Sequence, residues 1–349
     1  MYGKVSSSGA GPELSERANV AVRLAEAMKF ENENQHSIEQ LRSLESFAAN
    51  YIVSLSTGAN PRINVADALT ILTELAMHGS SAAESFMKAI ARQTQNPDIT
   101  DYLLKMANVI EFVRTLPDIP LLKADKPFSE KTYEKEGYFF VRGSSRPEKL
   151  VVVFTTMFNN FQLSNLVFYS FLKKYGVSVL FLKDCTYYNF LNGVRGLGSN
   201  IVEVSDSIKT IVRENEIKQT YITGFSSGGY ASLFCSYLAP CEKYLGFSIA
   251  SDLSSGSKIF PGKYFIDDAR KGIDERYLLN LRDMAAGSNG HVDRTLIFGE
   301  KSSVDSDHAM NMAGVETIKL RKVKNCQHAT ILIMISDGTF MPCIEEFLS

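Results

Sequence analysis

The chain has 349 residues, of which 45% are hydrophobic and 22% are charged, and its formal net charge is −2 at pH 7. These proportions are ordinary for a globular protein, and the length suggests about two domains. The near-neutral charge gives no electrostatic reason to expect nucleic acid as a partner. Lys319, Arg321, Lys322 and Lys324 cluster on one expected strand, and we interpret them as a solvated edge of the sheet.

The five cysteines are odd in number, irregularly spaced and without a CxxC pair. We therefore expect neither a disulfide framework nor a metal site, and reduced thiols instead. The first residues lack the apolar segment of a signal peptide, and the longest apolar run, 329–335, is too short to cross a bilayer. These features predict a cytoplasmic protein with no membrane span.

The N-terminal third of the chain differs in character from the rest. Residues 1–12 are small and polar, which predicts a disordered lead. Across residues 13–116 apolar residues recur every three or four positions, which predicts an all-α domain. Three prolines punctuate residues 117–127, which we interpret as a linker to a second domain at 128–349.

In the second domain short β-rich runs alternate with helical runs. Strands are expected at 138–142, 150–155, 177–182, 220–223, 245–249, 295–298 and 317–323. Helices are expected at 163–174, 201–215 and 230–237. Several strand runs are continuously hydrophobic, so the sequence predicts an α/β fold in which helices cover both faces of a mostly parallel sheet. Ligands bind such sheets beyond the carboxyl ends of the strands.

The most informative segment is Gly224-Phe225-Ser226-Ser227-Gly228, a G-x-S-x-G pattern between a β-rich run and a helical run. This is the setting of a nucleophilic serine on a tight strand-to-helix turn, where side chains at Gly224 or Gly228 would collide with backbone. The N–H of Ser227, at the helix N-terminus, is then expected to be one oxyanion donor. The alternatives are a glycine-rich packing turn and a phosphate-binding loop, but the phosphate loop's lysine is missing.

Three histidines follow Ser226 and are candidates for its general base. His328 lies between the last expected strand and a terminal helix expected from Ala329 onward, which is the position of the base in the chain order serine, acid, histidine. His291 precedes a strand and therefore belongs at the opposite edge of the sheet. His308 lies in the expected acid loop, where it would line the pocket or cap a helix. We predict His328 as the base.

The acid is expected on the loop after the sixth expected strand. Asp305 is the first candidate and Asp307 the second, although an aspartate there also serves as an N-cap for the next helix. Asp252, just after the preceding strand, is a third candidate. The prediction is therefore a triad of Ser226, His328 and Asp305, with two alternative acids.

Other polar residues are expected beside the same sheet edge. The second oxyanion donor should come from the loop after the second expected strand, through the N–H of Thr156 or Met157. Asp184, Tyr187 and Tyr188 follow the third expected strand, where an acid beside aromatic rings would bind a sugar. Tyrosine packing at a domain contact is the alternative interpretation.

Residues 130–349 resemble a bacterial branch of α/β hydrolases associated with surface polysaccharides, of the capsule O-acetyltransferase type found in meningococcal serogroup A. The resemblance is carried by VVVFTTMFNN, by FLKDCTYYNFLNGVRGLG before a helix, by the elbow TGFSSGGYASL and by the late histidine. It implies an α/β-hydrolase sheet. The segment DSDH that starts at Asp305 matches the acid loop of that type, which favours Asp305 as the acid.

The chemistry that these residues predict is acyl transfer through an acyl-enzyme on Ser226. Attack by water would give an esterase, and attack by a sugar hydroxyl an O-acyltransferase. The resemblance implies a glycan or glycoconjugate substrate, with acetyl-coenzyme A as a candidate acyl donor and no required cofactor. The alternatives are a small-molecule thioesterase or lipase-like hydrolase, and a non-catalytic module whose helical domain docks a protein partner.

Overall fold

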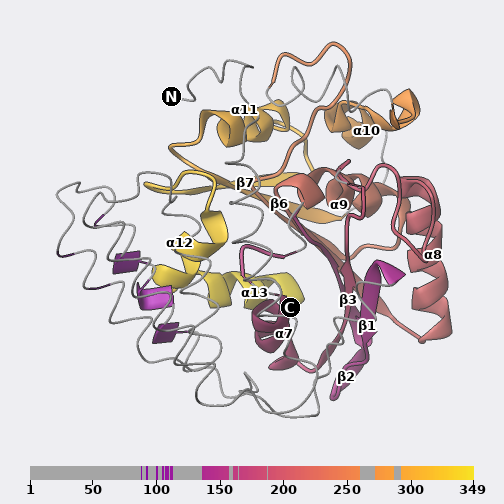
Figure 1. Ribbon diagram of the computed structural model, residues 1–349, viewed down its shortest axis with the longest axis horizontal. Helices are drawn as coiled ribbons and strands as arrows, with labels where there is room; N and C mark the ends of the chain where they lie inside the picture. Colours follow the sequence, from indigo (N-terminus) through magenta and orange to yellow (C-terminus); the bar gives the residue numbers. More distant parts are fainter. Residues whose placement is uncertain are drawn as a thin grey trace, which may run out of the picture.

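The computed structural model describes residues 136–156, 160–163, 165–186, 188–259, 272–286 and 292–349, with scattered helical residues between 88 and 112. The expected disordered lead, the linker and most of the expected all-α domain lie outside the described residues. Within the described ranges the chain forms one seven-stranded sheet with helices on both of its faces (Figure 1). The predicted α/β class is therefore confirmed.

The strands lie in the order β1-β3-β2-β4-β5-β6-β7. Only the edge strand β1 runs antiparallel to its neighbour, and every other neighbouring pair is parallel. The sheet is thus mostly parallel, and the carboxyl ends of β2 to β7 meet at one edge. The strands are β1 (Tyr138–Val141), β2 (Arg146–Phe154), β3 (Val177–Leu182), β4 (Gln219–Phe225), β5 (Lys243–Phe247), β6 (Asp293–Gly299) and β7 (Ile318–Val323).

All seven strands that the sequence predicts are present, with small differences at their ends. Strand β2 begins at Arg146, before the expected start at 150, because the register shifts between Arg146 and Leu150 and lets both ends pair with β3. Strand β5 ends at Phe247 rather than at 249. The next residue, Ser248, has φ of 48°, a left-handed conformation that turns the chain out of the sheet.

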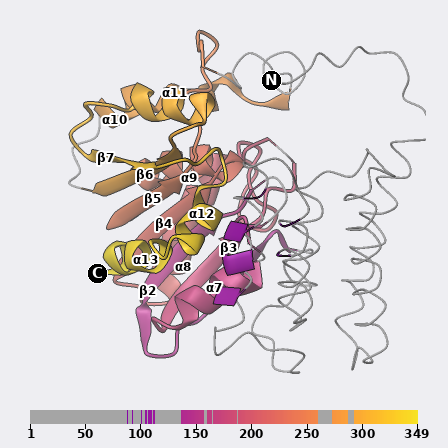
Figure 2. The same ribbon diagram turned by 90° about the vertical axis from the view of Figure 1, so that its left-hand side faces the viewer.

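Eight helices within the described ranges connect or follow the strands. Figure 1 shows α8 and α9 on one face of the sheet and α7, α12 and α13 on the other, whereas α10 and α11 lie at the β6–β7 end in both views (Figure 2). The helices are α7 (Asn165–Lys173), α8 (Ile201–Glu214), α9 (Ser227–Leu238), the 3-10 helix η3 (Glu275–Tyr277), α10 (Leu281–Ala286), α11 (Ser303–Asn311), α12 (Thr330–Ser336) and α13 (Phe340–Leu348).

Strand β2 shows why its sequence reads as a continuous hydrophobic run. Val151 and Val153 point into the core beneath α7, α12 and α13, and Val152 and Phe154 point into the core beneath α8 and α9. All four side chains are fully buried. A strand covered on both faces has no polar side, which is the pattern that the sequence predicted.

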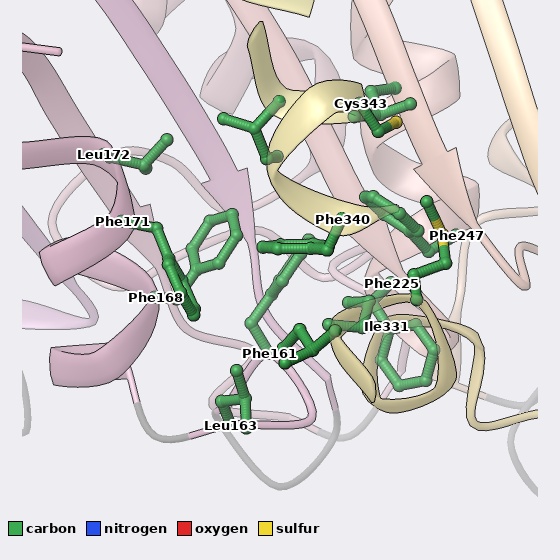
Figure 3. Packing of buried hydrophobic residues seen from close by; sticks show 14 of the residues in the cluster. Phe161, Leu163, Phe168, Phe171, Leu172, Phe225, Phe247, Ile331, Phe340 and Cys343 are labelled. Carbon is green, nitrogen blue, oxygen red and sulfur yellow. The ribbon is translucent and has the colours of Figure 1, made fainter. Parts of the chain in front are cut away.

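The core on the α7 side is rich in phenylalanine. Figure 3 shows Phe168 and Phe171 of α7 beside Phe340 of α13, with Phe161 from the loop after β2. The described part of the expected all-α domain joins the same core, because Ala107 and Val109 are fully buried in it and Phe112 stacks on Phe171 with ring centroids 5.7 Å apart. This N-terminal segment therefore packs directly on the α/β domain.

The expected single terminal helix is wrong. The chain forms two helices, α12 and α13, separated at Gly338, whose φ of 71° is outside the helical range. The ammonium groups of Lys149 and Lys243 donate to the carbonyl oxygens of Leu348 and Glu346 at the end of α13, where helix carbonyls lack partners. None of the helices in the described ranges has both the length and the apolar content that a membrane span needs.

Candidate active site

Ser226 lies at the junction between β4 and α9, at the carboxyl edge of the sheet. Its φ and ψ are 54° and −117°, a conformation that costs free energy for any residue with a side chain. The surrounding structure holds it in place: the N–H of Ser226 donates to the carbonyl of Phe247 at 3.0 Å, and its own carbonyl accepts from the N–H of Gly229 at 2.9 Å. The strained turn leaves the hydroxyl pointing out of the sheet edge.

The glycines two positions before and after Ser226 are required by close contacts. A Cβ at Gly224 would lie 2.1 Å from the hydroxyl oxygen of Ser232, and one at Gly228 would lie 2.3 Å from the carbonyl oxygen of Thr155. Both distances are far below van der Waals contact. The elbow therefore packs against the end of β2 on one side and its own helix on the other.

The imidazole of His328 reaches Ser226 from the loop after β7. Its Nε2 lies 2.8 Å from the Ser226 Oγ, and half of the His328 side chain is exposed. The ring also lies against Phe225, with ring centroids 5.3 Å apart. One edge of the imidazole is thus packed on the elbow while the other remains open to an incoming ligand.

Asp305 lies on the other side of the same imidazole. Its Oδ1 is 2.9 Å from His328 Nδ1, and the carboxylate is 3% exposed. Burial by itself would raise the pKa of the Asp305 carboxyl, but the hydrogen bond and charge of His328, with smaller effects of the Ser248 and Ser302 hydroxyls, outweigh it and lower the pKa below its usual value. An ionised carboxylate only accepts hydrogen bonds, so Nδ1 carries the proton and Nε2 is free to accept from Ser226.

Backbone hydrogen bonds between two loops set the distance from Asp305 to His328. The N–H of Glu300 donates to the backbone carbonyl of Val323 at 3.0 Å, and the N–H of Lys301 donates to the backbone carbonyl of Cys326 at 2.8 Å. The side chain of Glu300 in turn accepts from the N–H of Asn325 at 3.1 Å. The loop after β6 and the loop after β7 are therefore joined side by side immediately before the two functional residues.

The structure differs from the expected acid loop in one respect. The loop after β6 is short, and helix α11 begins at Ser303, so Asp305 lies in the first turn of a helix. Ser302 is the N-cap, with its hydroxyl accepting from the N–H of Asp305. Asp305 itself is therefore not the cap, which leaves its carboxylate to His328.

The two alternative acids lie away from the imidazole. Asp307 is exposed on α11, two residues beyond Asp305 and on a different side of the helix. Asp252 is buried, and its Oδ1 accepts from the N–H and hydroxyl of Ser254 in a local turn. Neither carboxylate is hydrogen-bonded to His328, whose Nδ1 lies against Asp305.

His308 neither lines an open pocket nor caps a helix. It lies inside α11 with 2% of its surface exposed, and its Nδ1 accepts from the N–H of Ser251 at 3.1 Å. The contact ties α11 to the segment after β5. His291 lies outside the described residues.

The residues after β3 that were expected to bind a sugar contact other parts of the protein. Asp184 is 1% exposed, and its two carboxylate oxygens accept from Thr186 and from the N–H of Phe190. Its acceptors are therefore used inside its own loop. Tyr188 is half-buried against the core beneath α8 and α9, within the α/β domain and not at a domain contact, and Tyr187 lies outside the described residues.

The expected oxyanion donors have separate outcomes. Ser227 is the first residue of α9, so its N–H has no acceptor within the helix and is available beside Ser226. The N–H of Thr156 is not available, because it donates to the carbonyl of Asn160 at 2.8 Å. Met157, the other candidate on that loop, lies outside the described residues.

Sequence reasoning missed Ser248. This buried residue donates from its hydroxyl to the carbonyl of His328 at 3.1 Å and thereby connects the end of β5 to the histidine loop. The sequence prediction placed Ser248 inside the expected strand 245–249, and only the earlier end of β5 at Phe247 puts it at the edge where ligands bind. A lone serine there is too common to identify without the fold.

Cys326 lies two residues before His328, and its thiol is not an alternative nucleophile. Burial, reinforced by the charge of Asp305, raises the pKa of the Cys326 thiol to about 12, so it is not a thiolate nucleophile at neutral pH. Among the described residues, no group of three or more His, Cys, Asp and Glu side chains is arranged to hold a metal ion.

The sheet is mostly parallel, and a strained serine elbow follows one of its central strands. A histidine follows the last strand, and an aspartate lies between the serine and the histidine in sequence. Together these features define the α/β-hydrolase fold.

No family model matches the chain, and no curated protein matches its sequence. Solved structures do match. MenH from S. aureus is 12% identical, with a TM-score of 0.42 over 61% of this chain and 97% of its own. Esterase B from Lactobacillus rhamnosis, with a tributyrin phosphonate, is 13% identical, with a TM-score of 0.45 over 62% of this chain and 89% of its own. Est1E from Butyrivibrio proteoclasticus, with ferulic acid bound, is 12% identical, with a TM-score of 0.41 over 61% and 95%. The fold assignment depends on the strand order and the elbow, which are independent of these similarities.

Proposed function

We propose that this chain is a serine esterase or O-acyltransferase that works through an acyl-enzyme on Ser226. The observation that carries the proposal is the continuous hydrogen-bonded chain of Ser226 Oγ, His328 and Asp305, with separations of 2.8 and 2.9 Å. Distances of this size are within the range for direct proton transfer between nucleophile and base. A binding module would need no such chain.

The first half-reaction forms the acyl-enzyme. Ser226 Oγ attacks the carbonyl carbon of an ester or thioester while His328 Nε2 takes the hydroxyl proton. The charge on the carbonyl oxygen is stabilised by the N–H of Ser227, and Asp305 stabilises the imidazolium without taking its proton. The tetrahedral intermediate then expels the alcohol or thiol, which leaves with the proton from His328.

The second half-reaction returns the enzyme to its starting state. Water or an acceptor hydroxyl gives its proton to His328 and attacks the acyl carbonyl, and Ser226 leaves with that proton. Water as the acceptor gives an esterase, and a sugar hydroxyl gives an O-acyltransferase. We propose a glycan or glycoconjugate as the substrate on the strength of the sequence resemblance alone, with acetyl-coenzyme A as the acyl donor of the transfer reaction.

The proposal is tested by labelling with a fluorophosphonate, which forms a covalent adduct with an activated serine. Intact mass should show one adduct on the wild type, none on Ser226→Ala and slowed formation on His328→Ala. Ser303→Ala removes an exposed serine of α11 and should label like the wild type. A wild type that stays unlabelled, or a Ser226→Ala variant that labels equally, would overturn the proposal in favour of a non-catalytic module.

A second assay separates hydrolysis from transfer. Release of p-nitrophenol from p-nitrophenyl acetate reports acyl-enzyme formation, and added glycan should be O-acetylated if transfer is the reaction. The same assay with acetyl-coenzyme A identifies the donor. Turnover of acyl thioesters alone, with no ester or glycan activity, would favour the thioesterase alternative.

A further inference from the structure

Gln162 connects the loop after β2 to the start of α12. Its Oε1 accepts from two backbone N–H groups, that of Ile331 at 3.0 Å and that of Leu332 at 3.3 Å. Its Nε2 lies 3.5 Å from the carbonyl oxygen of His328. Gln162 is held at φ of 61°, a left-handed conformation that is unusual for a glutamine. A strained residue at this point suggests a functional constraint on its position.

Helix α12 needs a cap from outside its own sequence. Its N-cap residue is Ala329, which has no side-chain acceptor and makes no side-chain cap hydrogen bond. The first N–H groups of a helix lack intrahelical acceptors, and a serine, threonine, aspartate or asparagine usually supplies one. Gln162 supplies it here from 169 residues earlier in the chain. His328 directly precedes Ala329, so the capped helix begins just after the histidine.

The contacts around Gln162 fix the backbone of His328 from two sides. The His328 carbonyl accepts from the hydroxyl of Ser248, which follows β5, and lies beside the amide of Gln162, which follows β2. Phe161, which precedes Gln162, and Ile331 of α12 also belong to the same apolar cluster (Figure 3). The imidazole is thus attached to a backbone that Gln162 helps to hold.

The loop that carries Gln162 is also the loop after β2, from which the second oxyanion donor is expected. Its described part is internally bonded, with the N–H of Thr156 donating to the carbonyl of Asn160. One side chain therefore joins the segment on the oxyanion side of Ser226 to the segment that carries the base. We propose that Gln162 is a positioning residue, which sets His328 relative to Ser226; this inference rests on the proposed function.

Four variants test this role. Gln162→Leu removes the polar atoms, and Gln162→Asn keeps an amide that is one methylene too short. Gln162→Glu keeps the acceptor oxygens. The double variant Gln162→Leu/Ala329→Ser gives α12 a cap of its own but leaves the two loops unconnected.

The measurements are the rate of fluorophosphonate labelling at Ser226, kcat and KM for p-nitrophenyl acetate, and the melting temperature. Gln162→Leu and Gln162→Asn should lower the labelling rate and kcat by about 10- to 100-fold with little change in KM, since a small misplacement of a base has effects of this size. Gln162→Glu keeps the acceptor for Ile331 and Leu332 but puts an oxygen where Nε2 donates towards the His328 carbonyl, so it should keep a melting temperature near that of wild type and still react more slowly. The double variant should recover the melting temperature but not the rate.

The outcomes separate this inference from the proposed function. If the wild type is not labelled at Ser226, the proposed function fails and this inference fails with it. If the wild type is labelled at Ser226 while Gln162→Leu and Gln162→Asn label equally fast, only the positioning role is overturned. The role is also overturned if Gln162→Glu or the double variant recovers rate together with stability, since that would reduce Gln162 to a helix cap. If Gln162→Leu does not fold, Gln162→Asn and the double variant are compared in its place.

Discussion

Gly228, two residues after the elbow serine, lies directly against the carbonyl of Thr155 at the end of β2. A Cβ on Gly228 would be 2.3 Å from the carbonyl oxygen of Thr155 and 2.6 Å from that of Phe154. Backbone atoms of the central strand cannot move aside as a flexible side chain can. The position of the nucleophile is therefore set by contact between two backbone segments.

We expect Gly228→Ala to push the elbow away from β2. Overpacking of this kind costs about 1–3 kcal/mol of the free energy of unfolding, and the displaced Ser226 should label with fluorophosphonate at least about tenfold more slowly. Urea unfolding and labelling rates measure the two effects. Gly256→Ala is the matched control, because a Cβ at Gly256 would meet nothing within 4 Å. A Gly228→Ala variant as stable and as reactive as this control would contradict the close contact.

The choice of acid predicts different results for two aspartates on one helix. Asp305→Asn should reduce the rate of p-nitrophenyl acetate hydrolysis by about 10²–10⁴-fold, because an amide does not stabilise the imidazolium and favours the wrong tautomer of His328. Asp307→Asn, at an exposed position of α11, should stay within about twofold of wild type. The opposite ranking of the two variants would move the acid to Asp307.

The lowered pKa of Asp305 predicts a pH dependence of stability. The pKa of an unfolded aspartate is about 3.9, so the ionised Asp305 stabilises the folded protein above this pH, and the stabilisation is lost as the pH falls through the lower folded pKa. The difference in the free energy of unfolding between wild type and Asp305→Asn should therefore shrink as urea titrations go from about pH 5 to below pH 4. A difference that grew towards acid pH would show that the pKa is raised instead.

Asp184 should contribute to stability rather than to substrate binding. Asp184→Asn places an amide N–H₂ where a carboxylate oxygen accepts from Thr186 or Phe190, and lost hydrogen bonds to a buried charge cost about 1.5–3 kcal/mol. KM for p-nitrophenyl acetate should not change. Asp206→Asn is the control, since the exposed pair of Asp206 with Lys209 on α8 is worth at most about 1 kcal/mol. A raised KM with unchanged stability would return Asp184 to the substrate site.

Most of the fold was determined by local patterns in the sequence. Continuous apolar runs predicted the central strands, because strands covered on both faces have no polar side, and all seven expected strands are present. The G-x-S-x-G pattern placed Ser226 at a strand-to-helix turn, because such a turn restricts the positions two residues before and after the serine to glycine. The two helices at the end of the chain were read as one, because the prediction did not use the turn signal Asp337-Gly338 that follows the apolar run 329–335.

The tertiary structure decided which side chains meet at the site, because this depends on the direction in which each side chain points. The sequence ranked Asp305 above Asp307 by resemblance and not by geometry. Residues two apart on a helix point to different sides, and the helix phase of α11 brings Asp305 to His328. Asp184 and Tyr188 follow β3 as expected, yet Asp184 is buried and Tyr188 is half-buried against the core beneath α8 and α9. The contact of Gln162 with α12 joins residues 169 positions apart, a distance at which no sequence pattern constrains a hydrogen bond. Local sequence fixes which element a residue joins, and only packing fixes the direction in which its side chain points.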